Sequence, residues 1–328
     1  MHDIQRAVNA LRAGQLVAFP TETVYGLGAD ALNPQAAARI FAAKGRPADH
    51  PLIVHLPDAE QLNVWARSIP REALALARAF WPGPLTLILK RSDEVPDIVT
   101  GGQDTVGLRV PGHPVALALL RAFGSGIAAP SANRFGRISP TTAEHVREEL
   151  GGQVSMILDG GPCDVGIEST ILDLSRDTPV ILRPGAITAD DIAAVIGRRP
   201  QQRCAAASAD VDAPRVSGSL AAHYAPRTPL QVLGLEEILT ALAVPGRAEA
   251  TAVLARRPPP GGSRCMVWRE APADAAGFAH ALYAALRDLD NLGAARILVE
   301  APEASPSWQA VADRLGRAAV GSGENGGG

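Results

Sequence analysis

Short apolar segments alternate with amphipathic stretches along most of this 328-residue chain, and most of the apolar segments end at proline, glycine or a charged residue. A helical pattern runs over residues 3–14, 33–45 and 189–196, whereas Leu16–Phe19 and Leu52–Leu56 have the character of buried strands. Further helices are expected at residues 59–66, 71–80, 113–123 and 141–150, and further strands at 85–90, 105–110, 155–158, 169–174 and 180–182. Intermixed strands and helices, with some strands adjacent in sequence, predict an α/β domain with an open, twisted mixed sheet.

The periodicity fades between residues 197 and 229, where Pro, Arg, Ser and Ala accumulate. Beyond this segment, β and α patterns alternate again up to about residue 320, which is typical of a small Rossmann-like layer. The chain is therefore expected to comprise a large first domain over residues 1–196, a linker over 197–229, a second domain over 230–320 and a flexible glycine-rich tail over 321–328.

Charge and cysteine content exclude several classes of protein. The net charge is −3 and the pI is near 6.2, so no overall attraction to nucleic acid or acidic membranes is expected. The three cysteines, Cys163, Cys204 and Cys265, are far apart and form no C-x-x-C pair. The N-terminus lacks the apolar core of a signal peptide, and no apolar run approaches the ~18 residues of a membrane helix. We expect a cytoplasmic protein without a membrane partner.

Lysine is rare in this chain, because only Lys44 and Lys90 occur among its 31 basic residues. Neither follows a glycine as in the phosphate loop of P-loop NTPases, and Lys90 does not stand in a kinase V-A-I-K strand. Phosphate chemistry must therefore use arginine, backbone N–H groups, a metal or one of these two lysines. Lys44, in Lys44-Gly-Arg46-Pro, suits either the cap of a helix C-terminus or a contact with a triphosphate.

One motif is a false lead. Gly26-Leu-Gly28-Ala-Asp-Ala31 matches the G-x-G-x-x-[GA] dinucleotide fingerprint. That fingerprint must connect a strand directly to a helix, whereas the next helix is expected only at Asn33-Pro34. A nicotinamide or flavin site is therefore not expected.

Polar side chains follow several of the predicted strands. The segment Phe19-Pro-Thr-Glu-Thr-Val-Tyr-Gly-Leu-Gly28 comes directly after one strand, and Ala129-Pro-Ser131-Ala-Asn133 after another. Arg109 lies in an otherwise apolar strand and needs an anionic partner, either a ligand carboxylate or phosphate or an internal Asp or Glu. Ser139 or Thr141 could cap the helix that follows. Together these groups predict a ligand crevice at the strand ends.

These motifs resemble, in order, a known family. Pro20-Thr-Glu-Thr-Val-Tyr-Gly-Leu27, Lys44-Gly-Arg46-Pro, Ser131-Ala-Asn133, Glu168-Ser-Thr170, Leu182-Arg-Pro-Gly185 and His223-Tyr-Ala-Pro226 are similar to those of the threonylcarbamoyl-AMP synthases. The resemblance is to the two-domain form, in which a YrdC-like domain is followed by a linker and a C-terminal domain. It rests on motifs as far as residue 226 and on size and β/α pattern beyond.

The resemblance implies a nucleotidyltransferase that makes threonylcarbamoyl-AMP from L-threonine, bicarbonate and ATP and releases pyrophosphate. A separate tRNA threonylcarbamoyl transferase complex would use the product to form threonylcarbamoyladenosine in tRNA. Mg²⁺ would accompany ATP, and no metal ligand is assigned to the protein. A stable complex with nucleic acid is not expected.

The family's site residues carry over to matching positions. L-threonine would contact Thr23, His55, Arg109, Ala129 and Ser169. ATP would contact Lys44, Arg46, His50, Thr105, Ser131, Asn133, Ser139, Arg183 and Tyr224, where His50 replaces the asparagine of the family pattern. Lys44, Arg46 and Arg109 are the expected catalytic residues, because the reaction needs positioning and charge neutralisation rather than a covalent nucleophile. The linker that carries Tyr224 would act as a lid over the water-labile carbamate.

Three other interpretations stay open. An RNA-binding module of the same fold would act on tRNA or double-stranded RNA without ATP chemistry, although no Lys/Arg stripe supports it. A carbamoyl-adenylate-forming enzyme of hydrogenase maturation would join this domain to zinc fingers, and the chain has no cysteine pairs for a finger. For a non-catalytic regulator, the complete motif set would be superfluous.

Overall fold

The computed structural model describes residues 2–202, 213–244, 246–261 and 263–323. Contacts within the backbone divide the chain into two compact units, one made of residues 1–135 and 140–219 and the other of residues 136–139 and 220–328. The boundary at residue 219 lies inside the segment 197–229 that the sequence predicted as a linker. Residues 213–219 thus belong with the first unit and 220–229 with the second, while residues 203–212 of the predicted linker, including Cys204, lie outside the described residues.

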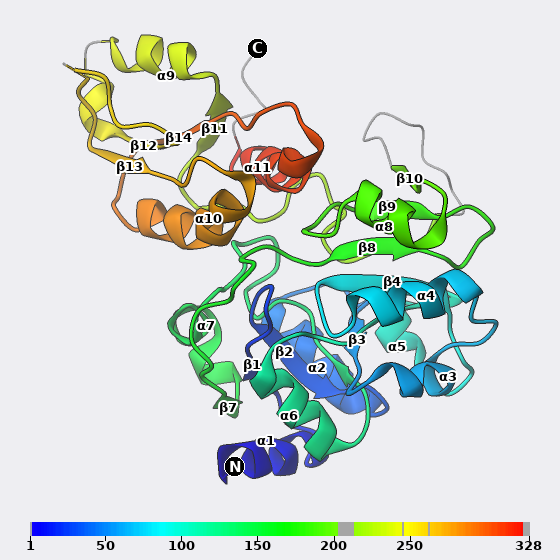
Figure 1. The fold of residues 1–328 in the computed structure, drawn as a ribbon. Coiled ribbons are helices and arrows are strands. Elements are labelled where there is room, and N and C mark those ends of the chain that lie inside the picture. The colour runs from blue at the N-terminus through cyan, green and yellow to red at the C-terminus, as the bar shows by residue number, and fades with distance from the viewer. Residues whose placement is uncertain (1, 203–212, 245, 262, 324–328) are drawn as a thin grey trace. The chain divides into compact units, whose positions relative to one another are not determined.

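The first unit is built on one large mixed sheet (Figure 1). Its strand order is β10-β9-β8-β4-β5-β3-β6-β2-β1-β7, with both parallel and antiparallel neighbours. The strands are β1 (Val17–Phe19), β2 (Gly26–Asp30), β3 (Ile53–His55), β4 (Leu85–Lys90), β5 (Thr105–Arg109), β6 (Ile127–Ala128), β7 (Met156–Ile157), β8 (Thr170–Asp173), β9 (Val180–Arg183) and β10 (Gln201–Gln202). The predicted α/β class with an open mixed sheet is confirmed.

Helices cover both faces of this sheet. They are α1 (His2–Arg12), α2 (Pro34–Lys44), α3 (Leu62–Trp65), α4 (Arg71–Phe80), α5 (Asp97–Thr100), α6 (Pro114–Phe123), α7 (Ala143–Leu150) and α8 (Ala189–Ile196), with 3₁₀ turns at Ala59–Gln61 and Gly151–Gln153. In β1, Val17 and Phe19 pack with α1 and α6, whereas Ala18 between them belongs to the main core on the opposite face. This alternation is the period of two expected for a strand buried on both faces.

A third apolar cluster lies on the same sheet face as α1 and α6 but is covered differently. Ile53, Ile88, Ile171 and Leu182 come from four strands, and Val216 of the segment 213–219 packs on them. An irregular segment therefore covers this part of the sheet. The residues next to Val216 in the segment 213–219 therefore lie beside the central strands.

Helix α2 begins and ends where the sequence predicts. The Asn33 side chain accepts hydrogen bonds from the backbone N–H groups of Gln35 and Ala36, and Pro34 is the first helical residue. Gly45 ends the helix in the left-handed region with φ of 62°, where glycine avoids the steric cost of a Cβ. Lys44 is consequently the last residue of α2.

Two local expectations are wrong. Gly26–Asp30 forms a strand, β2, which pairs antiparallel with β1 and β6, although the sequence indicated no strand there. A Cβ at Gly28 would lie 2.8 Å from the Phe19 ring and 2.9 Å from Ile127, so the glycine permits close packing between strands. Helix α7 is capped by Thr142, whose hydroxyl accepts from the His145 N–H at 3.3 Å, and not by Ser139 or Thr141.

The second unit contains a four-stranded, fully parallel sheet of order β11-β14-β12-β13. Its elements are β11 (Leu230–Leu233), α9 (Leu235–Leu242), β12 (Thr251–Ala255), β13 (Val267–Glu270), α10 (Ala275–Asp290), β14 (Arg296–Glu300) and α11 (Gln309–Gly321), with 3₁₀ turns at Ala248–Ala250 and Pro306–Trp308. The expected Rossmann-like character is confirmed, and β13 is an additional strand that the sequence did not indicate. Gly321, where the predicted tail begins, is the last residue of α11, and residues 324–328 lie outside the described part.

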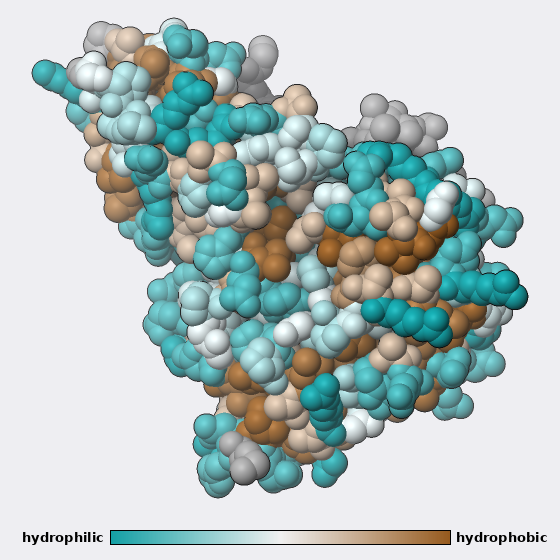
Figure 2. Space-filling view, in the orientation of Figure 1, coloured by the Kyte–Doolittle hydropathy of each residue, from teal (hydrophilic) through white to brown (hydrophobic). Residues whose placement is uncertain are grey.

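Exposed large apolar side chains are dispersed in the first unit. Leu32, Val64 and Leu74 are the ones identified there, and they come from three different segments. Figure 2 shows hydrophilic side chains over much of the visible face, with apolar areas between them. Single exposed apolar residues of this kind are normal for folded proteins. None of the helices in the described ranges combines the length and the apolar character needed to cross a membrane.

Candidate active site

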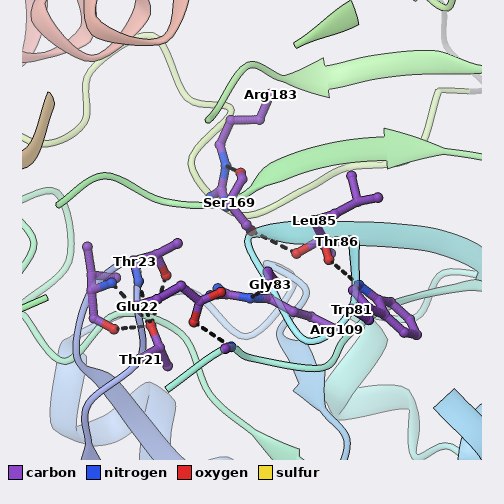
Figure 3. A network of polar contacts seen from close by, with 12 residues as sticks. Thr21, Glu22, Thr23, Trp81, Gly83, Leu85, Thr86, Arg109, Ser169 and Arg183 are labelled. Atoms are coloured by element: carbon purple, nitrogen blue, oxygen red, sulfur yellow. Dashed lines mark hydrogen bonds and ion pairs between the residues drawn. The ribbon is translucent and has the colours of Figure 1, made fainter. Parts of the chain in front are cut away.

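The loop after β1 is fixed by its own hydroxyl groups. The Thr21 hydroxyl accepts from the backbone N–H groups of Thr23 and Val24, both at 3.2 Å, and donates to the Val24 carbonyl at 2.6 Å. Its oxygen also lies 2.8 Å from the Thr23 hydroxyl, which is left to act as the donor in that pair. All of these groups are buried. The side chain between the two threonines, Glu22, points towards Arg109 (Figure 3).

Arg109, the last residue of β5, has an internal acidic partner. Its Nη2 lies 2.7 Å from Glu22 Oε1, and its Nε donates to the Gly83 carbonyl at 3.2 Å. The second carboxylate oxygen of Glu22 accepts from the Gly112 N–H at 2.8 Å. Of the two partners that the sequence left open for this buried arginine, a ligand or an internal carboxylate, the structure supplies the internal one.

His55 ends β3 and is paired in register with Arg109 on β5. Burial, together with the nearby Arg109 guanidinium, lowers the pKa of His55 to about 3, and backbone hydrogen bonds only partly oppose this shift. The imidazole is therefore neutral at ordinary pH, and its ring meets Phe19 edge-on at 6.0 Å. Ala129 follows β6 and donates its N–H to the Ile53 carbonyl at 2.9 Å, which places it beside the same strand.

A second group of polar side chains surrounds Ser169, just before β8 (Figure 3). The Ser169 hydroxyl lies 2.8 Å from that of Thr86 and accepts from Arg183 Nη2 at 3.1 Å. Arg183, which ends β9, also donates through Nε to the Ser169 carbonyl at 3.1 Å. The arginine is thus held in place by both the side chain and the backbone of one serine.

The two arginines Arg46 and Arg183 meet at Ser217 of the segment 213–219. Arg183 Nη1 donates to the Ser217 carbonyl at 2.9 Å, and Arg46 Nη2 donates to the Ser217 hydroxyl at 3.3 Å and to the Pro51 carbonyl at 2.9 Å. One serine therefore accepts from two buried guanidinium groups that come from distant parts of the sequence. Two cations brought together in this way are suited to bind an oxyanion.

Phe135 lies against the cationic residues that follow α2. The Arg46 guanidinium is 5.9 Å from the centre of the Phe135 ring, and the His50 ring meets it edge-on at 5.3 Å. Partial burial, followed by the charge of Arg46, lowers the pKa of His50. His50 therefore adds a hydrogen-bonding group but no positive charge at neutral pH.

Lys44 is buried, with 3% of its surface exposed, and its ammonium group is held by backbone carbonyls. Nζ donates to the Ser131 carbonyl at 2.6 Å and to the Asn133 carbonyl at 2.5 Å. Burial and the charge of Arg46 lower the pKa of Lys44, whereas Glu149 and Glu168 oppose that shift. The helix C-terminus, the loop after β6 and the lysine thus form one connected group.

Strand periodicity explains why many of these groups come together. Val54, Leu87 and Leu108 face the main core, so their neighbours His55, Thr86 and Arg109 lie on the opposite face of the central strands. Thr105, four residues before Arg109 on β5, shares this face and lines one small pocket with Pro51 and Ser217. The sequence predicted a crevice at strand ends. His55, Arg109 and Arg183 are the last residues of their strands, and one sheet face with the loops that reach it supplies the other groups.

Two predicted site residues lie in the second unit. Ser139 is buried there, and Tyr224 has a positive φ of 61° and stacks on Tyr283 with 5.8 Å between ring centres. The Arg314 guanidinium lies 5.2 Å from the Tyr224 ring within the same unit. The remaining predicted residues, namely Thr23, Lys44, Arg46, His50, His55, Thr105, Arg109, Ala129, Ser131, Asn133, Ser169 and Arg183, lie in the first unit.

Three participants were not assigned from the sequence. Glu22 pairs with Arg109, Thr86 with Ser169, and Ser217 with the two arginines. One signal for these contacts was present in the sequence, namely that the buried Arg109 needs an anionic partner. It did not indicate which carboxylate group is that partner. Within the residues that the structure describes, no group of three or more His, Cys, Asp or Glu side chains is arranged to hold a metal ion.

Comparisons with known proteins find matches to family models in both parts of the chain. A family model described as "Telomere recombination" (Sua5, YciO, YrdC) matches residues 9–185, and one described as "Threonylcarbamoyl-AMP synthase, C-terminal domain" matches residues 187–320. A threonylcarbamoyl-AMP synthase of Schizosaccharomyces pombe is 38% identical over 96% of this chain and 88% of its own length.

Other relatives match part of the chain more closely. Threonylcarbamoyl-AMP synthases of Pyrococcus abyssi and Bacillus subtilis are 51% and 50% identical over 68% and 70% of this chain. These matches span 65% and 66% of those two relatives, slightly less than two thirds of their length. A solved structure of P. abyssi Sua5 complexed with L-threonine superimposes with a TM-score of 0.89 and 42% identity, covering 97% of this chain and 94% of that one.

Proposed function

Since the chain belongs to the Sua5, YciO and YrdC family, in the form with the additional C-terminal domain, we propose that it synthesises threonylcarbamoyl-AMP. The substrates are L-threonine, bicarbonate and Mg²⁺-bound ATP, and pyrophosphate is released. The product would serve a tRNA threonylcarbamoyl transferase complex that forms threonylcarbamoyladenosine in tRNA.

One observation carries this proposal: the polar group around Arg109 and the polar group around Ser169 lie on the same sheet. The Gly83 carbonyl accepts from Arg109, and the adjacent Pro84 carbonyl accepts from the N–H of Thr170, which follows Ser169. The two residues that precede β4 therefore connect the group at Arg109 with the arginines at Ser217. A carboxylate-binding site and a phosphate-binding site side by side suit the joining of an amino acid to a nucleotide.

The first chemical step joins threonine to bicarbonate. Once the ammonium group of threonine has released a proton to solvent, the neutral amine attacks the carbon of bicarbonate or of CO₂ derived from it, and water is lost as the N-carboxylate forms. Arg109 would hold the threonine carboxylate and Thr23 would lie near the amino acid, so that these side chains orient the nucleophile. The neutral state of His55 lets it hydrogen-bond a substrate hydroxyl without adding charge.

The second step joins the carbamate to AMP. A carbamate oxygen attacks the α-phosphorus of ATP, the bond to the β-phosphate oxygen breaks, and pyrophosphate leaves. Lys44, Arg46 and Arg183 would neutralise the charge that develops on the phosphates, together with the Mg²⁺ that ATP brings. Removing one such contact costs roughly 2–4 kcal/mol of barrier, which corresponds to about 30- to 1000-fold in rate.

Pyrophosphate release from ATP tests the proposal. Release should require both bicarbonate and L-threonine, and serine and valine should support less of it than threonine does. If threonine changes nothing, the proposed function is wrong. A salt-dependent shift of tRNA at micromolar protein, without ATP turnover, would instead favour an RNA-binding module.

A further inference from the structure

Glu22 places a negative charge directly beside the arginine that is proposed to bind the threonine carboxylate. The residue is 8% exposed, and both of its carboxylate oxygens are engaged. One lies 2.7 Å from Arg109 Nη2, and the other accepts from the Gly112 N–H at 2.8 Å (Figure 3). Glu22 is also anchored through its backbone, because its carbonyl accepts from the Val165 N–H at 2.7 Å. The carboxylate therefore has little freedom to move away from Arg109.

Two titratable groups next to this pair, His55 and Cys163, carry no charge at neutral pH. The pKa of His55 is lowered to about 3 by burial and by Arg109. The pKa of the Cys163 thiol is raised to about 12, first by burial and then by the charge of Glu22. Neither group therefore adds charge beside Arg109, where the ion pair with Glu22 sets one negative charge against one positive charge.

The neutrality of the Arg109–Glu22 ion pair affects which ligands bind more tightly because of Arg109. A ligand with only a carboxylate would place two negative groups around one guanidinium in a buried site, which like-charge repulsion disfavours. An amino acid brings an ammonium group together with its carboxylate, so the total charge of the site is unchanged when it binds. A buried Arg–Glu pair is therefore matched to a zwitterion and not to an anion.

We propose that Glu22 is a specificity-determining residue that makes this site select zwitterionic amino acids over carboxylates without an amino group. The inference rests on the proposed function, because it takes Arg109 as the group that binds the threonine carboxylate. A site with this selectivity would exclude hydroxy acids and other anions that share the carboxylate and side chain of threonine but cannot form a carbamate.

Calorimetric titration of the full chain with L-threonine and with 3-hydroxybutyrate, which lacks only the amino group, tests the proposal. The wild-type protein should bind threonine more tightly by roughly 10- to 100-fold, the effect expected of one charge about 6–12 Å away at an effective dielectric constant of about 20. In Glu22→Gln, which keeps the shape and an acceptor for the Gly112 N–H, this preference should fall by about tenfold or more. An unchanged preference in Glu22→Gln overturns the proposal.

Two further variants complete the test. Glu22→Asp keeps the charge and should retain the preference, and if Glu22→Gln does not fold, a loss of preference in Glu22→Asp is the result that overturns the proposal. Glu72→Gln removes a carboxylate that pairs with Arg198 at 3.0 Å near the surface, and it should leave the preference unchanged. If the wild-type protein binds neither ligand, the proposed function itself fails, which separates the two outcomes.

Discussion

At the scale of single residues, Lys44 shows how one side chain can serve both the fold and the proposed chemistry. Its ammonium group donates to the carbonyls of Ser131 and Asn133 in a buried environment, and Lys44 is the last residue of α2. Both carbonyls accept from the compact ammonium group of the lysine. Arginine has a planar, forked guanidinium group and would not fit the same two acceptors in the same way. A compact cation fixed at a helix end is well placed to meet phosphate groups.

Replacing Lys44 tests this role. Lys44→Ala should lower kcat/KM by roughly 30- to 1000-fold, because one cation that stabilises the transition state is removed. The variant should retain a cooperative unfolding transition by circular dichroism. Lys90→Ala, at the exposed end of β4, is the matched control and should turn over at the wild-type rate. Wild-type turnover in Lys44→Ala would leave this lysine only a structural role, through its contacts with the Ser131 and Asn133 carbonyls.

His55 predicts a pH dependence of stability. The pKa is about 3 in the folded protein and near 6.5 in the unfolded chain, so between these values the unfolded state binds the extra proton. The contribution of the neutral histidine is complete above pH 6.5 and is lost at about 1.4 kcal/mol per pH unit as the pH falls towards 3. Urea denaturation from pH 7 to 4.5 should therefore show a flatter curve for His55→Gln than for the wild type. Parallel curves would contradict the lowered pKa.

At the scale of elements, β2 depends on a small residue at a crowded position. Gly28 lies between the Phe19 ring and the Ile127 side chain, and a Cβ would also approach the Val17 carbonyl at 3.1 Å. Gly28→Val should destabilise the protein by about 1–3 kcal/mol through overpacking, as measured by chemical denaturation. Gly151→Ala is the control, because no atom lies within 4 Å of the added Cβ and φ is −42°. Equal stability of the two variants would contradict the packing described for β2.

Local signals account for the elements that sequence reasoning located correctly. Helix α2 carries its own N-cap and C-cap, and α4 and α8 begin and end as their patterns predict. Strands β2 and β13 lacked such signals. Strand β2 has glycine at two of its five positions, and tertiary packing determines it. The Glu22–Arg109 pair joins residues 87 positions apart (109 − 22), and no local pattern could have matched these two charges.

At the scale of the whole molecule, the division into two units does not follow the sequence in order. Residues 136–139 belong to the second unit, where the Gly136 carbonyl accepts from the Ala225 N–H and Arg137 pairs with Asp290. The sequence predicted one continuous first domain over residues 1–196. A segment of only four residues that belongs to another unit cannot be detected from composition or periodicity. It brings Ser139, an expected ATP contact, into the unit that also holds Tyr224.

Asp290 ties this four-residue segment and the start of the second unit together. Its carboxylate accepts from the N–H groups of Thr228 at 2.7 Å and Arg227 at 3.0 Å, in addition to the contact with Arg137. Asp290→Ala should destabilise the protein by about 2–3 kcal/mol, because the partly buried donors of Thr228 and Arg137 lose their acceptor. Chemical denaturation measures this loss, and Asp288→Ala, at an exposed ion pair with Arg269, should change stability by less than about 1 kcal/mol. Equal losses in the two variants would contradict the anchoring role.

The most direct test of the central claim is detection of the product itself. Incubation of the full chain with ATP, Mg²⁺, L-threonine and ¹³C-labelled bicarbonate, followed by rapid quenching and mass spectrometry, should show threonylcarbamoyl-AMP that carries one labelled carbon. The product should be missing when threonine or bicarbonate is omitted. Turnover of ATP without incorporation of the label into an adenylate, or no turnover at all under these conditions, would contradict the account.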